Sequence, residues 1–247
     1  GQQAAFLRVS QQGSGPAGRH DLKSLMSVDE QHWTGSASEK PIVGLRGYKV
    51  ADPEKAASRR REILHAAARV LGTRGYHMTT TDDIAREIGG TKGVVYYHFR
   101  SEEEIFLELM CNAITAASER LDACARGPGS PTERLRLAIS THLTNDLDPE
   151  QESYYAMLAA HDLRALSPEN AATVRELQRD YRHRFAALIQ EGIDDGSVDP
   201  GDAEVMALTI LGAIGRVFDW FRPSGRLSRE AVVDEVARLL CNSIARR

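Results

Sequence analysis

The sequence predicts an all-α protein, and three observations carry that prediction. Apolar residues recur with the 3.6-residue period of a helix through most of residues 53–245. Glycine and proline residues, which end helices, interrupt this period at intervals, for example at Gly75 and within residues 127–129. No segment combines the alternating pattern and the β-branched residues of a strand. The 247 residues are enough for a small helical domain followed by a larger one.

Residues 1–51 precede the first expected helix and lack its pattern. They are rich in Gly, Ser and Gln with scattered charge, so we expect a disordered N-terminal extension. The first helix should begin at Pro53, a residue type that suits a first helical turn, and end before Gly75. Its inward face carries Ile63, Ala67 and Leu71.

Residues 80–99 hold two short helices joined by a glycine turn. Thr80 is of a residue type that caps helix N-termini. The apolar residues that follow it fall on one face of a helix: Ile84, Ala85 and Ile88. The glycines at positions 89 and 90 can adopt the left-handed conformation that ends a helix. We therefore expect a short helix that is buried along its apolar face.

The second short helix follows this turn, with Thr91 in position to cap it. Val95 and Phe99 should turn inward. The residues expected on the exposed side are Lys92, Gly93, Val94 and Tyr96. Short side chains near the start of such a helix let its backbone approach the floor of the DNA major groove. This order of elements is typical of a helix-turn-helix reader of DNA, and an ordinary helical hairpin is the alternative.

Charge is divided along the chain as expected for a DNA-binding domain. Residues 53–100 hold nine Lys or Arg residues and five acidic residues, a balance of +4, whereas the whole chain is at −4. The rest of the chain therefore carries −8. Because phosphates attract a basic domain, we expect residues 52–100 to face double-stranded DNA and the acidic domain of residues 101–247 to face another partner.

Ten residues of this stretch follow a spacing found in one family. They are Thr79, Thr80, Ile84, Ala85, Gly89, Gly93, Tyr96, Tyr97, His98 and Phe99. With them the stretch resembles the TetR family of bacterial transcriptional regulators. The resemblance implies a homodimeric repressor on a palindromic operator. Together with the exposed face of the second helix, it predicts these DNA-contacting residues: Lys55, Arg59, Arg60, Thr79, Thr80, Thr91, Lys92, Gly93, Val94, Tyr96, Tyr97 and His98.

Two positions depart from the family's pattern. Gly90 stands where an apolar residue usually follows the turn glycine, so we expect a more mobile turn. Glu102 stands where the family often has a lysine that touches a DNA phosphate. A carboxylate there suits the positive end of a helix dipole but repels a phosphate. Affinity for DNA should therefore depend more on the other basic residues.

The larger domain should contain six further helices, at residues 101–126, 131–147, 150–162, 168–194, 200–221 and 228–245. The helix at 200–221 is apolar nearly all round, which suits burial on two sides. By resemblance to the family, the last two helices of two subunits form a four-helix dimer interface, and a monomer core is the alternative. The expected interface residues are Leu208, Leu211, Gly212, Gly215, Val236 and Leu240.

Residues 219–228 resemble the junction Trp-aromatic-Arg-Pro-X-Gly-X-Leu-Ser of TetR regulators that sense acyl-coenzyme A thioesters in lipid and steroid breakdown. The resemblance implies a small apolar effector of this class. Three arginines that share one helix face beside an apolar series would suit its phosphates, although a solvated face is the alternative. The candidate ligand-binding residues are Tyr155, Arg175, Arg179, Arg182, His183 and Phe218.

No catalytic site, cofactor or metal site is expected. His142, His161 and His183 fall on three different expected helices, and the aspartates near them form no recognised nucleophile or metal pattern. The three cysteines are widely spaced, which argues against a disulfide framework and a zinc site. No stretch approaches the roughly 20 apolar residues needed to span a bilayer, so we expect no membrane partner and a cytoplasmic protein.

Other functions are compatible with the same residues. Within the same class, the protein could be an activator or could sense an unrelated aromatic or drug-like ligand. From another class, the larger domain could be a helical enzyme or a partner-binding module with a vestigial DNA reader. The cavity of that domain distinguishes these, because an enzyme needs converging titratable groups whereas a sensor needs mainly apolar walls.

Overall fold

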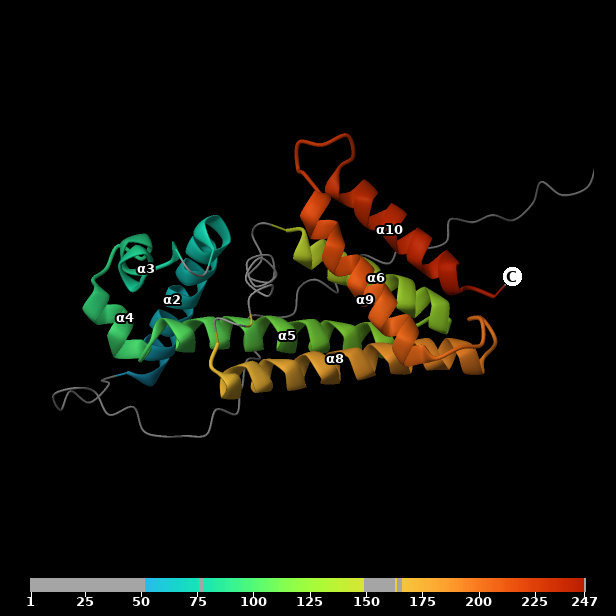
Figure 1. Ribbon diagram of the computed structural model, residues 1–247, viewed down its shortest axis with the longest axis horizontal. Helices are drawn as coiled ribbons and strands as arrows, with labels where there is room; N and C mark the ends of the chain where they lie inside the picture. Colours follow the sequence, from blue (N-terminus) through green and yellow to red (C-terminus); the bar gives the residue numbers. More distant parts are fainter. Residues whose placement is uncertain (1–51, 76–77, 149–162, 164–165, 247) are drawn as a thin grey trace, which may run out of the picture. The chain divides into compact units, whose positions relative to one another are not determined.

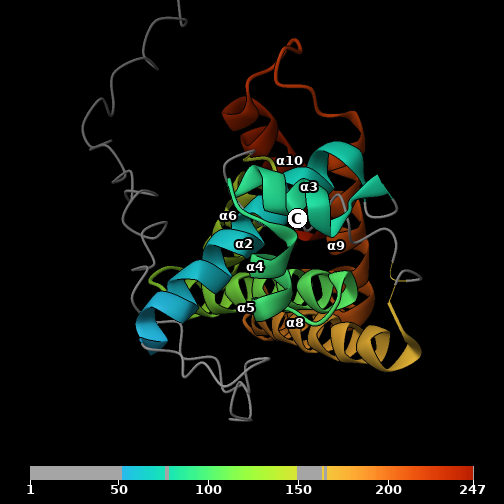
Figure 2. The same cartoon turned by 90° about the vertical axis from the view of Figure 1, so that its left-hand side faces the viewer.

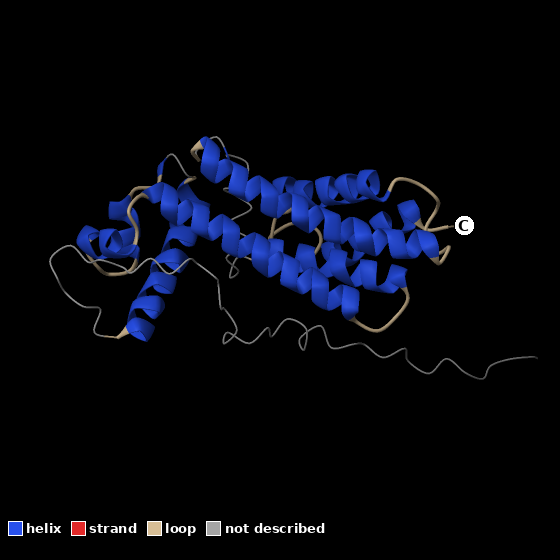
Figure 3. Ribbon diagram, turned by 90° about the horizontal axis from the view of Figure 1, so that it is seen from below, coloured by secondary structure: helices blue, strands red, loops and turns tan. Residues whose placement is uncertain are grey.

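The structure, a computed structural model, describes residues 52–75, 78–148, 163 and 166–246. These described residues form eight α-helices and no strand, with one isolated bridge between Val198 and Ala245 (Figures 1 and 3). The prediction of an all-α fold is confirmed. The expected extension of residues 1–51 and the expected helix of residues 150–162 lie outside the described residues.

The helices begin and end close to the positions that the apolar period and its breaks predict. Their bounds are α2 Pro53–Arg74, α3 Thr81–Glu87, α4 Lys92–His98, α5 Glu102–Arg126, α6 Pro131–Asp146, α8 Pro168–Asp194, α9 Ala203–Trp220 and α10 Arg229–Ile244. Helix α2 ends at Gly75, whose φ of 76° lies in the left-handed region that favours glycine.

Capping side chains explain where most of the helices begin. In seven of the eight described helices, the side chain just before the first turn accepts hydrogen bonds from backbone amides of that turn. These N-cap residues are Asp52, Thr80, Ser101, Ser130, Ser167, Asp202 and Ser228. Thr91 holds the same position before α4, but its side chain makes no capping hydrogen bond to the described backbone of that helix. The hydroxyl expected to cap α4 therefore does not do so.

Helices α2, α3 and α4 share one hydrophobic core with the beginning of α5. Figure 2 shows these helices grouped together. Ile63, Ile84, Val95 and Phe99 are each no more than 2% exposed. They belong to the same buried cluster as Ile105 of α5. The inward orientation predicted for the first four of these residues is confirmed.

Helices α5 and α8 lie side by side and take part in two separate hydrophobic clusters (Figures 1 and 3). Met110 of α5 and Val174 of α8 belong to the cluster of the helix-turn-helix. Leu121 and Phe185, farther along the same two helices, belong to the other cluster. The packing therefore changes within these helices, between Met110 and Leu121 of α5 and between Val174 and Phe185 of α8. Both helices connect the two cores.

The second cluster fills the space between the end of α5 and helices α6, α8, α9 and α10. Its fully buried members include Ile139, Leu143, Ile189 and Ile210. Helix α8 packs against α9, and α6 packs against α10. Because burial of each such side chain contributes about 1.5 to 3 kcal/mol, this core holds α5, α6 and α8 in a defined arrangement.

Candidate DNA-binding surface and effector cavity

Helix α3 is closed at both ends by local hydrogen bonds. The Asp83 amide donates to the Thr80 hydroxyl (3.3 Å), and the Thr80 amide donates to the Asp83 carboxylate (3.2 Å), which forms a capping box. At the other end, the amides of Gly89 (φ 59°) and Gly90 donate to carbonyls of the last turn at 3.1 and 2.9 Å. This is a Schellman motif. The roles predicted for Thr80 and Gly89 in starting and ending the helix are confirmed.

Helix α4 presents one open face. Its exposed residues are Lys92, Gly93, Tyr96 and Tyr97. A Cβ built at Gly93 would meet only the hydroxyl of Thr91, at 3.7 Å, among the described atoms within 4 Å. Val94, expected on this face, is instead half-buried against the core. The backbone at the start of α4 is thus accessible to a surface as close as the floor of a major groove.

The exposed side chains of α4 make contacts within the domain. The Lys92 ammonium lies 3.2 Å from the Asp82 carboxylate, which raises the pKa of Lys92, and 5.8 Å from the centre of the Tyr96 ring. The Tyr96 hydroxyl lies 3.5 Å from the Thr81 hydroxyl. Exposed ion pairs of this kind contribute little to stability. DNA can therefore replace these contacts at low cost.

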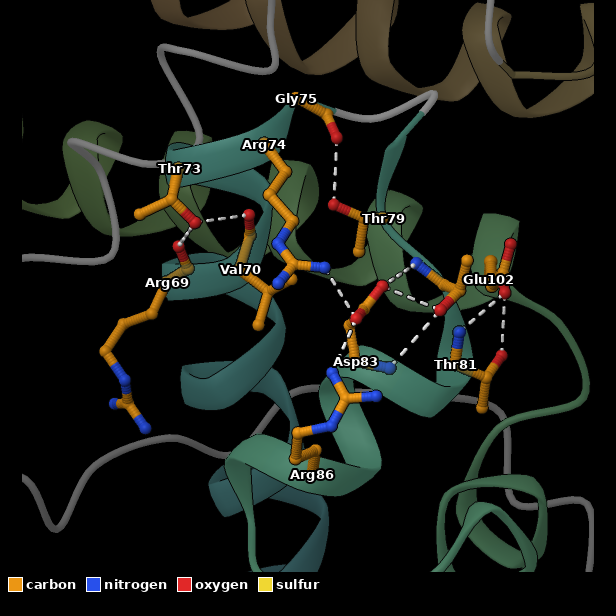
Figure 4. Close-up of polar contacts among 11 residues, drawn as sticks. Arg69, Val70, Thr73, Arg74, Gly75, Thr79, Thr81, Asp83, Arg86 and Glu102 are labelled. Carbon is orange, nitrogen blue, oxygen red and sulfur yellow. Dashed lines mark hydrogen bonds and ion pairs between the residues drawn. The ribbon is translucent and has the colours of Figure 1, made fainter.

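Glu102, at the start of α5, contacts helix α3 of the helix-turn-helix. Its carboxylate accepts hydrogen bonds from the Thr81 amide (2.7 Å) and the Thr81 hydroxyl (2.8 Å), as Figure 4 shows. From the sequence we expected this carboxylate to suit the positive end of its own helix and to repel a phosphate. It also joins the start of α5 to the start of α3.

Asp83 links helices α2 and α3 in the same region (Figure 4). Its carboxylate lies 2.6 Å from the Arg74 guanidinium and 2.9 Å from that of Arg86. Hydrogen bonds from Thr80 and Arg86 lower the pKa of Asp83 to about 2. Because one carboxylate receives several donors, the end of α2 is fixed against the start of α3.

Gly90 leaves room for an arginine of α2. A Cβ at this position would lie 3.2 Å from Nη2 of Arg59 and 3.2 Å from Cδ1 of Ile88, which is closer than ordinary contacts. The guanidinium of Arg59 also lies 2.6 Å from the Glu62 carboxylate. The long side chain of Arg59 from α2 therefore lies where the turn lacks an apolar side chain.

Arg60 is engaged inside the protein. Its guanidinium forms ion pairs with Glu104 and Glu108, donates to the carbonyl of His98, and lies 3.9 Å from the centre of the Phe99 ring. Burial opposes its charge, but the two glutamates raise the pKa of Arg60 overall. These contacts fasten α2 to α5, so we do not count Arg60 among the proposed DNA contacts.

Two other expected DNA contacts are also turned toward the protein. Thr79 is 8% exposed, and its hydroxyl donates to the Gly75 carbonyl at 2.8 Å. His98 is half-buried, and burial together with the charge of Arg60 lowers its pKa, which favours the neutral ring. By contrast, the side chain of Lys55 is 86% exposed, and its ion pair with Asp52 at 3.5 Å is one that a phosphate can replace.

A cavity lies between α5, α6 and α8 in the larger domain. Its enclosed volume is ≈ 10 Å³, about enough for one water molecule. It is lined by Ala117, Arg120, Leu121, Cys124, Ala138, Thr141, His142, Asp146 and Tyr181. Its walls are more polar than those expected of a sensor for an apolar ligand.

The polar side chains of the cavity form a chain of contacts from α6 to α8. The Tyr181 hydroxyl is hydrogen-bonded to Nδ1 of His142. His142 Nε2 lies 2.9 Å from Oδ2 of Asp146, close enough for an ion pair but not aligned for a hydrogen bond. Burial, followed by the nearby Asp146 charge, raises the pKa of Tyr181. Tyr181 is therefore a neutral hydroxyl that links the two helices.

The described residues that we expected to bind ligand do not line this cavity. Arg175 and Arg179 are exposed on α8. Arg182 lies 3.2 Å from the Glu204 carboxylate of α9, and His183 is hydrogen-bonded to the same carboxylate. Tyr155 lies outside the described residues. The three arginines thus share a helix face, as their spacing predicts, but that face does not border the cavity.

Known proteins match this chain in both of its parts. The family model described as "Bacterial regulatory proteins, tetR family" matches residues 63–109, and that described as "Tetracyclin repressor-like, C-terminal domain" matches residues 128–244. The crystal structure of a transcriptional regulator of the TetR/AcrR family from Thermobifida fusca is 34% identical, with a TM-score of 0.57, and the match covers 77% of this chain and 100% of that one. The chain belongs to the TetR family.

Two further relatives of this TetR-family protein have names that state what they regulate or bind. The fatty acid metabolism regulator protein of Bacillus subtilis is 25% identical over 185 residues, 74% of this chain and 94% of its own. The crystal structure of AibR in complex with isovaleryl coenzyme A and operator DNA is 25% identical with a TM-score of 0.66, and the match covers 75% of this chain and 97% of that one. The protein is a transcriptional regulator and not an enzyme. Catalysis therefore does not explain the titratable groups of its cavity.

On the last two helices of this TetR-family chain, several large apolar side chains are exposed. Val205 and Leu208 of α9 are 57% and 53% exposed, and Leu239 of α10 is 52% exposed. A Cβ at the exposed Gly212 would meet no described atom within 4 Å. The other expected interface residues, and Phe218, are half-buried: Leu211, Gly215, Phe218, Val236 and Leu240. Packing within one subunit leaves this apolar face uncovered by any described residue of the chain.

The His, Cys, Asp and Glu side chains of the described residues include no group of three placed to hold a metal ion. Among the described helices, none has both the length and the apolar character needed to cross a membrane. The three cysteines are free thiols.

Sequence reasoning missed Arg120 and Thr141 as cavity residues. A signal for Arg120 exists, because it falls at helical spacing between Ala117 and Cys124, on the apolar face of α5. An arginine on an apolar helix face is a candidate for a contact with another buried polar group. Thr141 carries no such signal, since threonine is common on any helix face.

Proposed function

We propose that the protein is a dimeric repressor that places α4 of each subunit in the major groove of a palindromic operator. The observation that carries this proposal is the open face of α4, where Lys92 and Tyr96 stand exposed beside an accessible backbone at Gly93. The balance of +4 in residues 53–100 of an acidic chain supports it, because phosphates attract that segment. In this proposal Lys92 and Tyr96 reach base edges, whereas Lys55, Thr91 and Tyr97 reach the backbone.

The two subunits are proposed to pair through α9 and α10. The exposed apolar side chains Val205, Leu208 and Leu239 support this pairing, because a second copy would remove their surface from water. The uncovered glycine at position 212 lets two helices approach closely. Pairing of the same face on both subunits gives a two-fold dimer, which reads a palindrome.

Helices α5 and α8 are proposed to carry the signal from the cavity to the DNA reader. Arg120 at the cavity and Met110 in the core of the reader are on one helix, separated by about 15 Å of helix length. The start of α8 is fastened to the start of α5, because the Ser167 amide and the Asn170 side-chain amide both donate to Glu103, at 2.6 and 2.7 Å. A ligand that tilts one of these helices therefore tilts both.

The effector is proposed to be an acyl-CoA thioester whose acyl end enters the cavity. The resemblance of residues 219–228 to the acyl-CoA branch supports this, as does the isovaleryl coenzyme A complex of the relative AibR. The enclosed part of the cavity has a volume of ≈ 10 Å³, about enough for one water molecule. The acyl part therefore enters only if α5, α6 or α8 moves, and the coenzyme A moiety lies outside the cavity.

Operator release tests the proposal. DNA fragments that the protein retains from genomic DNA supply the operator, and fluorescence anisotropy of the complex follows its release. A panel of acyl-CoAs should release the operator, and the matching free acids should act weakly because they lack the part bound outside the cavity. Failure to retain any DNA sequence selectively would contradict the repressor function. Release by the free acids alone would reject only the coenzyme A assignment.

A further inference from the structure

The lysine of helix α4 is paired with an aspartate from the helix before it. Lys92 is the only lysine or arginine within α4, Lys92–His98. Its ammonium lies 3.2 Å from the Asp82 carboxylate of α3, and the two side chains are 47% and 60% exposed. The contact therefore joins the first turn of α3 to the first turn of α4 on a surface that is open to solvent.

Asp82 is not needed to start its own helix. Thr80 and Asp83 form the capping box at the beginning of α3. The Thr81 amide of the same turn donates to Glu102 at 2.7 Å. A carboxylate in the first turn also favours the helix dipole, but Asp83 already supplies one. What Asp82 adds is its hydrogen bond with α4.

The charges around Lys92 favour a neutral partner over an anionic one. The pKa of Lys92 is raised by the hydrogen bond with Asp82 and by the charge of that carboxylate, and to a smaller extent by the charge of Glu102. A DNA phosphate that approaches the ammonium also approaches these carboxylates, which repel it. A guanine edge presents two acceptor atoms, N7 and O6, without a net charge, so it is not repelled in this way.

We propose that Asp82 is a specificity-determining residue of the helix-turn-helix, because it directs Lys92 to a guanine and away from phosphates. The proposal rests on the proposed function, since it takes α4 as the helix that enters the major groove. An ammonium has three N–H donors, so Lys92 keeps its hydrogen bond with Asp82 while another N–H reaches the base. Asp82 acts through Lys92 and touches no base itself, so it is a positioning residue.

An ordinary surface ion pair is the alternative, and the same helix supplies one for comparison. Glu87 at the end of α3 lies 2.9 Å from Arg69 of α2, and the two side chains are 41% and 50% exposed. This pair is as open to solvent as the Asp82 pair, but its cation lies outside α4. Replacement of either acid by its amide removes one negative charge from α3. Glu87→Gln is therefore the matched control for Asp82→Asn.

The ratio of operator affinity to random-duplex affinity tests the proposal. Fluorescence anisotropy of the full-length protein measures both affinities at several salt concentrations, with the two duplexes equal in length. At low salt, Asp82→Asn should bind the random duplex about tenfold more tightly, with a slope of log affinity against log salt that is steeper by about 0.9 for each subunit. The operator should gain much less, because Lys92 already contacts a base there, so the affinity ratio should fall several-fold. Glu87→Gln should leave the affinity ratio unchanged.

Two further measurements show whether the effect passes through Lys92. In the Lys92→Ala background, Asp82→Asn should leave the affinity ratio unchanged, whereas a general charge effect would lower it as in the wild type. Replacement of operator guanines one at a time by 7-deazaguanine removes the N7 acceptor. At one position of each half-site this change should weaken binding by the wild type several-fold and leave binding by Lys92→Ala unchanged.

An unchanged affinity ratio in Asp82→Asn, an equal fall in Glu87→Gln, or a fall that persists without Lys92 would overturn the proposal. So would an operator in which no guanine distinguishes the wild type from Lys92→Ala. Urea unfolding of Asp82→Asn accompanies these measurements, and its midpoint should not move, since an exposed ion pair contributes little to stability.

Failure of the proposed function has a different signature. If Lys92→Ala and Tyr96→Ala select the same DNA as the wild type, α4 is not in the groove, and both the proposed function and this proposal fail. If no operator is retained at all, both fail as well. If the two variants do relax selection while Asp82→Asn leaves the affinity ratio unchanged, the repressor stands and only the role of Asp82 is rejected.

Discussion

Glu102 at the start of α5 accepts two hydrogen bonds from Thr81 at the start of α3, at 2.7 Å from the amide and 2.8 Å from the hydroxyl. This contact joins α3 of the helix-turn-helix to α5, which we propose carries the effector signal. The family often has a lysine at this position that touches a DNA phosphate. Here the same position serves the internal packing of the reader and adds a charge that repels DNA.

Replacement of this carboxylate by a cation should strengthen DNA binding. In Glu102→Lys, each added phosphate contact should steepen the slope of log affinity against log salt by about 0.9. The variant should also lose about 1 kcal/mol of unfolding free energy, because the Thr81 amide loses its acceptor. Glu102→Ala is the control, since it removes the acceptor without adding a cation. Equal salt slopes in the two variants would show that position 102 does not approach a phosphate.

The two glycines of the turn should respond differently to substitution. Gly89→Ala forces a side chain into the left-handed region, φ 59°, and should cost roughly 1 to 2 kcal/mol of unfolding free energy. Gly90→Ala meets the flexible ends of Arg59 and Ile88 at 3.2 Å, and φ at Gly90 is not positive, so the change should stay within about 0.5 kcal/mol. Urea unfolding measures both. A larger loss at Gly90 than at Gly89 would mean that the Arg59 contact is rigid.

Substitutions of Arg60 and Lys55 should separate effects on stability from effects on DNA binding. Arg60→Gln leaves Glu104 and Glu108 facing each other without their cation, so it should lower the unfolding free energy by about 1 to 3 kcal/mol. Lys55→Gln should change stability by less than about 0.5 kcal/mol, because its side chain is 86% exposed, while reducing the salt dependence of DNA binding. Denaturation and salt titrations on both variants check this. A reduced salt dependence in Arg60→Gln, with a loss of stability in Lys55→Gln, would make Arg60 the DNA contact.

Leu208→Arg should separate the subunits. The arginine would lie unpaired in the proposed α9 and α10 interface, which is strongly unfavourable, so the protein should sediment as a monomer and lose operator binding. Ala187→Arg adds the same charge at an exposed position of α8 and should leave both properties intact. Analytical ultracentrifugation decides the matter. A dimer of normal mass after the Leu208 change would place the interface elsewhere.

The DNA reader was predictable because its signals are local. The cap at Thr80, the left-handed glycine at 89 and the inward residues of two short helices all act within a few positions of the chain. The directions of Thr79 and Arg60 were not predictable in the same way. Each is set by a partner outside its own turn, the Gly75 carbonyl for Thr79 and Glu108 of another helix for Arg60.

The cavity could not be derived from the sequence, because its residues come from three helices whose facing sides are set by tertiary packing. Helical spacing correctly groups Arg175, Arg179 and Arg182 on one face but does not say whether that face points to a cavity or to water. Tertiary packing decides this. It turns Tyr181 of the same helix inward, and it brings Tyr181 to His142 of α6.

The central claim is that α4 reads base edges in a two-fold operator, and selection from random double-stranded DNA tests it most directly. The wild-type protein should enrich inverted repeats whose half-site centres lie about 10 base pairs, or a multiple of that, apart. Lys92→Ala and Tyr96→Ala should relax the selection at particular positions, because a base contact supplies roughly 1 to 3 kcal/mol of discrimination. Tyr97→Phe should weaken all sites about equally. Enrichment of the same sequences with the same selectivity by the wild type and by both base-edge variants would contradict the account and remove α4 from the groove.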